Sequence, residues 1–124
     1  MKTTESTQRI PLSSHECESR LNAVSDALYV IGGKWKLRII IALLDGSKRF
    51  NELQRLITGI SAKVLSSELK DLELNGFVKR TVNADSIPVS VEYERTDYAN
   101  TLTDVLTALH EWGAMHRNKI MQRS

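Results

Sequence analysis

The spacing of apolar residues divides the chain into helices and one pair of strands. Four stretches repeat apolar positions at steps of three and four, which predicts helices with one buried face. A fifth stretch is almost continuously apolar. A step of two appears only between residues 77 and 95, where it predicts strands. The predicted helices lie at residues 19–31, 35–44, 51–57, 62–74 and 97–121.

The continuous apolar run from Ile39 to Leu44 predicts a buried central helix. A buried strand competes with it, since isoleucine is β-branched and periodicity cannot separate the two in so short a run. The Ala-Leu-Leu continuation and the closing Asp45-Gly46 favour the helix. In the next helix, Asn51 is the expected N-cap, with Gln54 reaching back to it.

The helix over residues 62–74 has start and stop signals that agree with its periodicity. Ser61 is a suitable N-cap, and Ile60 before it can pack onto Leu65. After the last apolar position, Asn75-Gly76 predicts a left-handed C-cap, with Phe77 folding back onto the helix as in a Schellman motif.

Alternation follows that helix and predicts a two-stranded ribbon. Val91 and Tyr93 fall on one face, and Glu92 and Glu94 fall on the other. The intervening residues 83–88 have the composition of a turn. Because a two-stranded ribbon is marginally stable alone, we expect it to pack against the helices. The short segment "SKRF" before the third helix predicts a small strand or turn.

The last helix carries an apolar stripe longer than the core of a small domain can cover, so a second copy of the chain is its expected partner. The first helix contributes a shorter stripe of the same kind. The residues predicted to form the dimer interface are Leu21, Val24, Leu28, Tyr98, Leu102, Val105, Leu109, Trp112 and His116.

Length and composition indicate an ordinary globular domain. The chain has 124 residues, of which 41% are hydrophobic and 26% charged, which fits one domain with its own core. Residues 1–15 are polar and without periodicity, so a flexible tail is expected there and the domain is expected over residues 16–124. A single cysteine and no long apolar run indicate a reducing compartment, and we expect the cytoplasm.

Charge is unevenly distributed along the chain. Residues 34–80 hold ten Lys or Arg against five Asp or Glu, whereas the whole chain has a net charge of only +2. A positive centre between slightly negative ends suggests a surface that faces a polyanion, although chance clustering explains a segment of this size about as well.

The order of elements predicts an α+β, mainly helical fold. Two short helices joined by the four-residue turn Thr58–Ser61 form a helix-turn-helix, and the ribbon that follows makes it a winged helix. A long C-terminal dimerisation helix completes the predicted architecture. In this type of fold the second helix of the motif enters the DNA major groove, which is about 12 Å wide.

Four motifs give the chain a specific resemblance. "IGGKWK", "RFNELQRLITGISAKVLSSELKDLELNGFVKR", "PVSVEYERT" and "HEWG" occur in an order and spacing that resemble the HxlR family of winged-helix transcription regulators, relatives of the MarR group. The resemblance covers roughly residues 28–113. It implies a homodimeric bacterial DNA-binding repressor or activator, with repression favoured, that pairs through its first and last helices.

The outward face of the second motif helix is the predicted reading surface. Its serines can hydrogen-bond base edges or phosphates, and its lysines can bind guanine or phosphate oxygens. A solvated polar face is the alternative, and the motif context favours the DNA interpretation. The predicted DNA-binding residues are Ser61, Ala62, Lys63, Ser66, Ser67 and Lys70, together with Arg49, Gln54, Arg55, Lys79 and Arg80.

Cys17 is a candidate sensor of oxidants or electrophiles. Its neighbours Glu16 and Glu18 disfavour the thiolate that such chemistry needs, while Arg20 offsets them in part, so an incidental thiol is the alternative. No pair of His and Cys residues has the spacing of a zinc motif, and no catalytic arrangement emerges. We therefore expect no metal, no cofactor and no enzyme activity.

Two functions from different classes remain open. The first is a dimeric regulator that reads an inverted repeat of double-stranded DNA, with a small-molecule effector or oxidant as a further, unidentified partner. The second is a winged-helix module that contacts another protein and has no DNA role. The basic centre and the small polar reading face favour DNA, since a protein-docking face would carry exposed aromatic residues or methionine.

Overall fold

The computed structural model describes residues 13–122. The chain forms two compact units, with the boundary between Gly32 and Gly33. The sequence predicts a single domain over residues 16–124, so this boundary falls inside it. Most of the predicted tail at residues 1–15 lies outside the described residues. Among the helices of the described region, none is both long enough and apolar enough to cross a membrane.

In the described part of the first unit the chain forms the helix α2 (Ser14–Ile31). It begins before the predicted residue 19, because a capping box fixes its start: the Ser13 hydroxyl accepts from the Glu16 amide at 3.0 Å, and the Glu16 carboxylate accepts from the Ser13 amide at 2.8 Å. These hydrogen bonds lower the pKa of Glu16. The last three residues of the predicted tail, 13–15, therefore form the N-cap and the start of α2.

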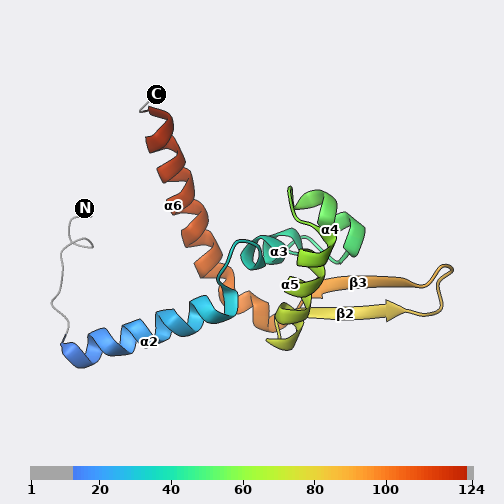
Figure 1. Ribbon diagram of the computed structural model, residues 1–124, viewed down its shortest axis with the longest axis horizontal. Helices are drawn as coiled ribbons and strands as arrows, with labels where there is room; N and C mark the ends of the chain where they lie inside the picture. The colour runs from blue at the N-terminus through green and yellow to red at the C-terminus, as the bar shows by residue number, and fades with distance from the viewer. Residues whose placement is uncertain (1–12, 123–124) are drawn as a thin grey trace. The chain divides into compact units, whose positions relative to one another are not determined.

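The second unit is a winged helix (Figure 1). Its buried side chains come from three helices and the turns between them, from the start of the ribbon and from the turn before the last helix. Ile39, Ile40, Leu43, Leu53, Leu65 and Leu72 are completely buried. The elements are α3 (Lys36–Ala42), β1 (Lys48–Arg49), α4 (Phe50–Leu56), α5 (Ala62–Leu74), β2 (Val78–Asn83), β3 (Ser90–Arg95), η1 (Asp97–Leu102) and α6 (Thr103–Gln122).

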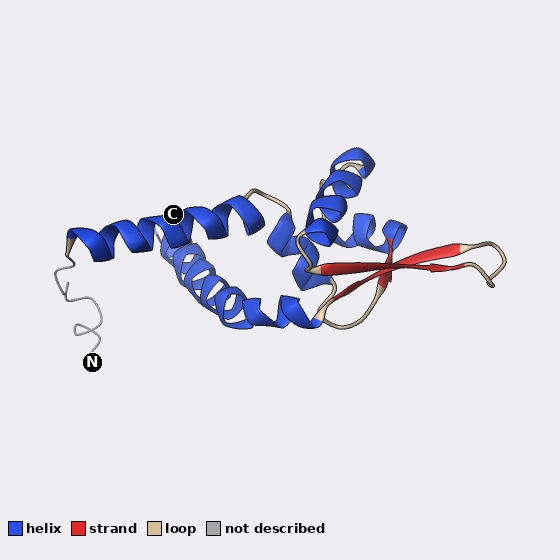
Figure 2. Ribbon diagram, turned by 90° about the horizontal axis from the view of Figure 1, so that it is seen from below, coloured by secondary structure: helices blue, strands red, loops and turns tan. Residues whose placement is uncertain are grey.

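The predicted ribbon is part of a three-stranded antiparallel sheet in the order β1-β3-β2. In β3, Tyr93 lies opposite Arg80 of β2 and opposite Lys48 of β1. The short β1 thus covers only the base of the ribbon. Figure 2 shows β2 and β3 continuing as a two-stranded arm beyond the helices. At "SKRF", where the sequence predicts a small strand or turn, the structure has the strand β1, which anchors the ribbon to the helices.

The central run is a helix, α3, as predicted, and the competing strand is excluded. Its burial is less complete than expected. Ile39, Ile40 and Leu43 are fully buried, whereas Ile41 and Leu44 are about half exposed. A helix packed from one side buries one face only, so a continuous apolar run overstates its burial.

The predicted start of α4 is wrong. The helix begins at Phe50, and the N-cap is Arg49 rather than Asn51. The Glu52 carboxylate accepts from the Arg49 amide at 2.7 Å. Because β1 ends at Arg49, the chain enters α4 two residues earlier than the side-chain preferences suggested, and Glu52 takes the role expected of Gln54.

The predicted helix over 97–121 is divided in two. Asp97–Leu102 forms the 3₁₀ helix η1, capped by the Thr96 side chain, and α6 follows it. The short turn folds Ala99 and Leu102 into the core. Leu102, expected at the dimer interface, is thus only 8% exposed in the single chain. None of the residues of α6 is buried.

Candidate nucleic-acid interface

The core holds α5 along one face. Leu65, Leu69 and Leu72 are at most 2% exposed, and each buried leucine stabilises the packing by about 1.5–3 kcal/mol relative to an exposed one. At the N-terminus, the Ser61 hydroxyl accepts from the Val64 amide at 3.1 Å, which confirms the predicted cap. The opposite face of the helix is left free for a partner.

The C-terminus of α5 is the predicted Schellman motif. The Phe77 amide donates to the Leu72 carbonyl at 2.9 Å, and the Gly76 amide donates to the Glu73 carbonyl at 3.1 Å. Gly76 has φ +84°, a conformation that favours glycine. The Thr96 hydroxyl donates to the Gly76 carbonyl at 2.6 Å. This end of α5 is therefore tied to the end of the ribbon.

Trp35 supports the turn between α4 and α5. Its ring lies 3.9 Å from the position that a Cβ would take on Gly59, which has φ +89°. Lys34 and Arg38 lie over the same ring at 4.9 and 4.8 Å from its centroid. Arg38 also donates to the Thr58 carbonyl at 3.4 Å. The half-buried indole thus packs against the turn and carries two cations on its ring.

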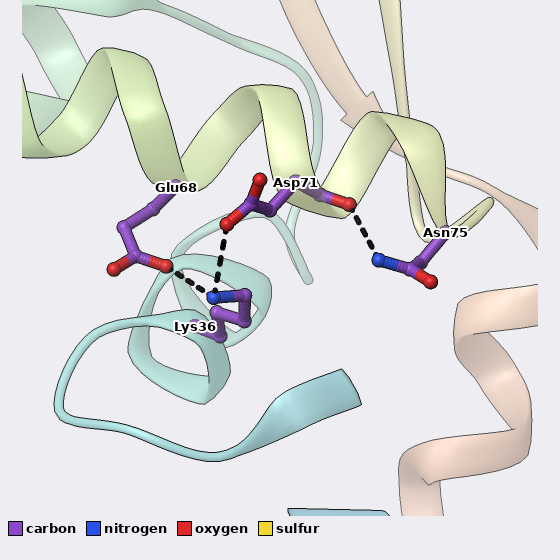
Figure 3. A network of polar contacts seen from close by, with 4 residues as sticks. All are labelled: Lys36, Glu68, Asp71 and Asn75. Carbon is purple, nitrogen blue, oxygen red and sulfur yellow. Dashed lines mark hydrogen bonds and ion pairs between the residues drawn. The ribbon is translucent and has the colours of Figure 1, made fainter. Parts of the chain in front are cut away.

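Lys36 joins α3 to α5 through two carboxylates (Figure 3). Its ammonium lies 2.6 Å from Glu68 Oε1 and 3.5 Å from Asp71 Oδ2. The Lys36 side chain is 14% exposed. The hydrogen bond to Glu68 raises the pKa of Lys36, against the desolvation that lowers it. The ammonium therefore stays charged, pairs with both carboxylates on the inner flank of α5 and offsets one of their two negative charges. The Asn75 amide, donating to the Asp71 carbonyl at 2.9 Å, closes the network.

Five of the six predicted reading residues lie on α5, and the sixth, Ser61, is its N-cap. Lys63, Ser67 and Lys70 are exposed, as are the cap Ser61 and its neighbour Ala62, while Ser66 is partly covered. The face combines two cations with small hydroxyls and a methyl group. Groups of this kind can approach base edges closely.

The flanking predicted residues lie on three elements. Arg49 caps α4, and Gln54 and Arg55 lie on that helix. Lys79 and Arg80 lie on β2, where alternation directs them to opposite faces of the ribbon. Only Arg80 lines a cleft together with residues of α5. The structure thus brings Ser66, Lys70 and Arg80 together and leaves Lys79 on the other side.

The predicted dimer residues other than Leu102 are exposed. They are Leu21, Val24 and Leu28 on α2, Tyr98 on η1, and Val105, Leu109, Trp112 and His116 on α6. The Tyr98 ring stacks on Phe77 with centroids 5.0 Å apart, and the Trp112 and His116 rings stack at 4.8 Å. An exposed apolar stripe on α6 therefore remains after the chain has folded.

Two further kinds of candidate site concern the cysteine and possible metal ligands. Cys17 is exposed on α2 as a free thiol. Within residues 13–122, no group of three or more His, Cys, Asp or Glu residues is placed to hold a metal ion.

Sequence reasoning missed two residues. Lys36 had no signal that pointed to α5, because its partners are more than thirty positions away. Alternation in the sequence assigned Tyr93 to one face of the ribbon. Its position beside α5 depends on the strand register, which the sequence does not reveal.

Comparison with known proteins identifies the family. Residues 30–121 match the HxlR-like helix-turn-helix family. The chain is 42% identical over 98 residues to YtcD of Bacillus subtilis, an uncharacterized HTH-type transcriptional regulator, and the match covers 79% of this chain and 77% of YtcD.

Solved structures agree with the family match. A crystal structure of ytcD superimposes with a TM-score of 0.73 at 43% identity, covering 77% of this chain and 96% of that one. The redox regulator HypR in its reduced form gives a TM-score of 0.73 at 37% identity, covering 81% and 98%. The relatives are transcriptional regulators and not enzymes. The chain, with its winged helix and long C-terminal helix, belongs to the HxlR-like helix-turn-helix family of transcriptional regulators.

Proposed function

We propose that this protein is a homodimeric repressor that reads an inverted-repeat operator through the outward face of α5. The observation that carries the proposal is the split of α5 into one fully buried face and one face of Lys63, Ser66, Ser67 and Lys70. A helix held this firmly presents its free side chains in a fixed arrangement, as base recognition requires.

Charge supports DNA over a protein partner for this face. Lys63 and Lys70 form no ion pair with any residue in the described part of the chain. The two acidic residues on the inner flank, Glu68 and Asp71, both pair with Lys36 instead. The two lysines of the outward face are therefore available to pair with a polyanion.

The exposed stripe of α6 supports the homodimer. Leu109, Trp112 and Met115 follow one another at steps of three along the helix and are each at least half exposed in the single chain. A second copy would bury this stripe by an isologous contact, and the α2 stripe would add to it. In a dimer the two α5 helices would enter major grooves about 34 Å apart, one turn of DNA. A DNA partner is consistent with the cytoplasm as the place of action.

The test is binding to the DNA upstream of the protein's own gene, followed by fluorescence anisotropy at several salt concentrations. Affinity should fall steeply with salt. Lys63→Ala should weaken binding, and the salt slope should fall by about one if the lost contact is to phosphate. Arg117→Ala removes an exposed charge from α6 away from the proposed dimer stripe and serves as the matched control. Binding that ignores both salt and the α5 substitutions would leave the protein-contact module as the better proposal.

A second candidate function is redox control through Cys17. The observation that favours it is an exposed free thiol on α2, a helix proposed to contribute to the dimer. HypR, a structural neighbour at 39% identity, is described as a redox regulator in its oxidized form. Cys17→Ser should abolish any change of DNA affinity on oxidation and leave the affinity of the reduced protein intact. An oxidation response that survives the substitution would reject the thiol as the sensor.

A further inference from the structure

A cleft separates α5 from the base of the ribbon. It is lined by Ser66, Leu69, Lys70 and Glu73 from α5 and by Arg80 and Tyr93 from the two strands. Leu69 is 2% exposed and closes the cleft toward the core. The other five side chains are polar, and they come from the two elements that a winged helix presents to DNA.

Strand register explains why Arg80 and Tyr93 face this cleft together. They lie directly opposite each other in the β2–β3 ladder, so their side chains point to the same side of the sheet. Val78, two positions before Arg80, shares that side and is buried in the core. The face that begins in the core at Val78 therefore opens into the cleft at Arg80. Lys79 points to the opposite side.

Much of the hydrogen-bonding capacity of the cleft is unused within residues 13–122. Neither Lys70 nor Arg80 forms an ion pair with another residue between 13 and 122, in contrast to Lys36 and Lys48, which are both paired. Over the same residues, the Tyr93 hydroxyl makes no side-chain hydrogen bond. Two cations and a phenol thus converge with only one carboxylate, Glu73, beside them.

We propose that this cleft binds one phosphate of the DNA backbone, held by Lys70 and Arg80 and by a hydrogen bond from Tyr93. The inference rests on the proposed DNA-binding function and adds Tyr93 as a contact residue. A guanidinium and an ammonium suit the phosphate oxygens, and a hydroxyl adds a neutral donor. The phosphate would fix the angle between α5 and the DNA, while the outward face of α5 reads the bases.

The test replaces single phosphates of a bound DNA duplex with neutral methylphosphonates. In the wild-type protein, one position near each half-site should weaken binding by more than about tenfold, because the change removes a charge that three side chains contact. Tyr93→Phe removes only the hydroxyl and should weaken binding to unmodified DNA by about tenfold, the worth of one hydrogen bond to a charged group. Against the methylphosphonate at that position, Tyr93→Phe should cause no further loss.

Two matched variants sharpen the result. Arg80→Gln should lose affinity, lower the salt slope by about one, and show the same coupling to that phosphate. Lys79→Gln removes the same charge from the other face of the ribbon, and its effect should add to that of the methylphosphonate. Glu73→Gln removes the one carboxylate from the cleft and should tighten binding.

The possible outcomes distinguish a failure of the cleft proposal from a failure of the proposed DNA-binding function. If wild-type protein binds its DNA but no methylphosphonate couples to Tyr93→Phe, the cleft proposal is overturned and the proposed function stands. If wild-type protein shows no affinity for DNA, both fall. If inorganic phosphate binds the DNA-free protein and Arg80→Gln abolishes that binding without changing DNA affinity, the ligand is a free phosphate and the backbone assignment is wrong.

Discussion

Helices α5 and α6 have the same kind of sequence and opposite environments. Both repeat apolar residues at steps of three and four over at least three turns. In α5 three leucines of the stripe are at most 2% exposed, whereas none of the residues of α6 is buried. The pattern shows which face of a helix seeks a partner, and it does not show whether the partner belongs to the same chain.

The exposed faces of the two helices differ in their chemistry. The outward face of α5 carries free lysines and small hydroxyls, and its inner flank is tied to α3 by Lys36. The apolar face of α6 includes the exposed rings of Trp112 and His116. The free surface of α5 therefore suits a polyanion, and that of α6 suits another apolar helix.

The largest expected effect lies on α6. Leu109→Asp would place a carboxylate in the proposed dimer interface, so the protein should become monomeric or aggregate. Sedimentation velocity measures the change. Thr107→Asp, on the opposite side of the helix, is the control and should leave the dimer intact. A Leu109→Asp protein that remains a dimer would show that this stripe is not the interface.

The next largest effect lies on the buried face of α5. Leu65→Ala should lower the free energy of unfolding by about 2–5 kcal/mol, because it leaves a cavity in the core. Leu74→Ala makes the same change at an exposed position of the same helix and should alter stability by about 0.5 kcal/mol or less. Urea denaturation compares the two variants. Equal losses would contradict the one-sided burial of α5.

A smaller effect is expected at Lys36. Lys36→Met would leave Glu68 partly buried without its cation, which should cost on the order of 1–3 kcal/mol. Lys36→Arg keeps the charge and should recover part of the loss. If Lys36 also positions α5, the methionine variant should lose DNA affinity at temperatures where it is fully folded. Unchanged affinity there would limit Lys36 to a structural role.

The same lysine predicts a pH dependence. Because the hydrogen bond to Glu68 raises the pKa of Lys36 in the folded protein, the folded state holds this proton more tightly than the unfolded state. The stabilisation is fully present below the unfolded pKa and is lost as pH rises through the folded pKa. The stability difference between wild type and Lys36→Met should therefore be constant near neutral pH and shrink in strongly alkaline buffer. A difference that grows with pH would contradict this assignment.

Local signals in the sequence were sufficient for the fold around α5. Ser61, Gly76 and the leucine stripe act within a few residues of one another, and the structure has the cap, the Schellman turn and the burial they predict. The start of α4 was missed because β1 feeds the chain into the helix at Arg49. The break before α6 was missed because it depends on Thr96. This residue hydrogen-bonds to Gly76, at the C-terminus of α5, and caps the 3₁₀ helix η1.

The candidate site also has a part that the sequence predicts and a part that it does not. Periodicity alone could place Lys63, Ser67 and Lys70 on one exposed face. The contacts of Lys36 with Glu68, and of the cleft residues Arg80 and Tyr93 with each other, join segments far apart in the chain. Such contacts depend on packing and strand register, which one sequence does not determine at the level of single residues.

The most direct test of the central claim is the specificity of the α5 face. The ratio of the Kd for scrambled DNA to the Kd for the upstream DNA should be measured at one salt concentration, for the wild type and for Lys63→Ala/Ser67→Ala. The account predicts a large ratio for the wild type, of about 10³ or more, and a clear fall in the variant as binding to its own site weakens toward nonspecific levels. A ratio near one for the wild type, or an undiminished ratio in the variant, would contradict the claim that α5 reads DNA sequence.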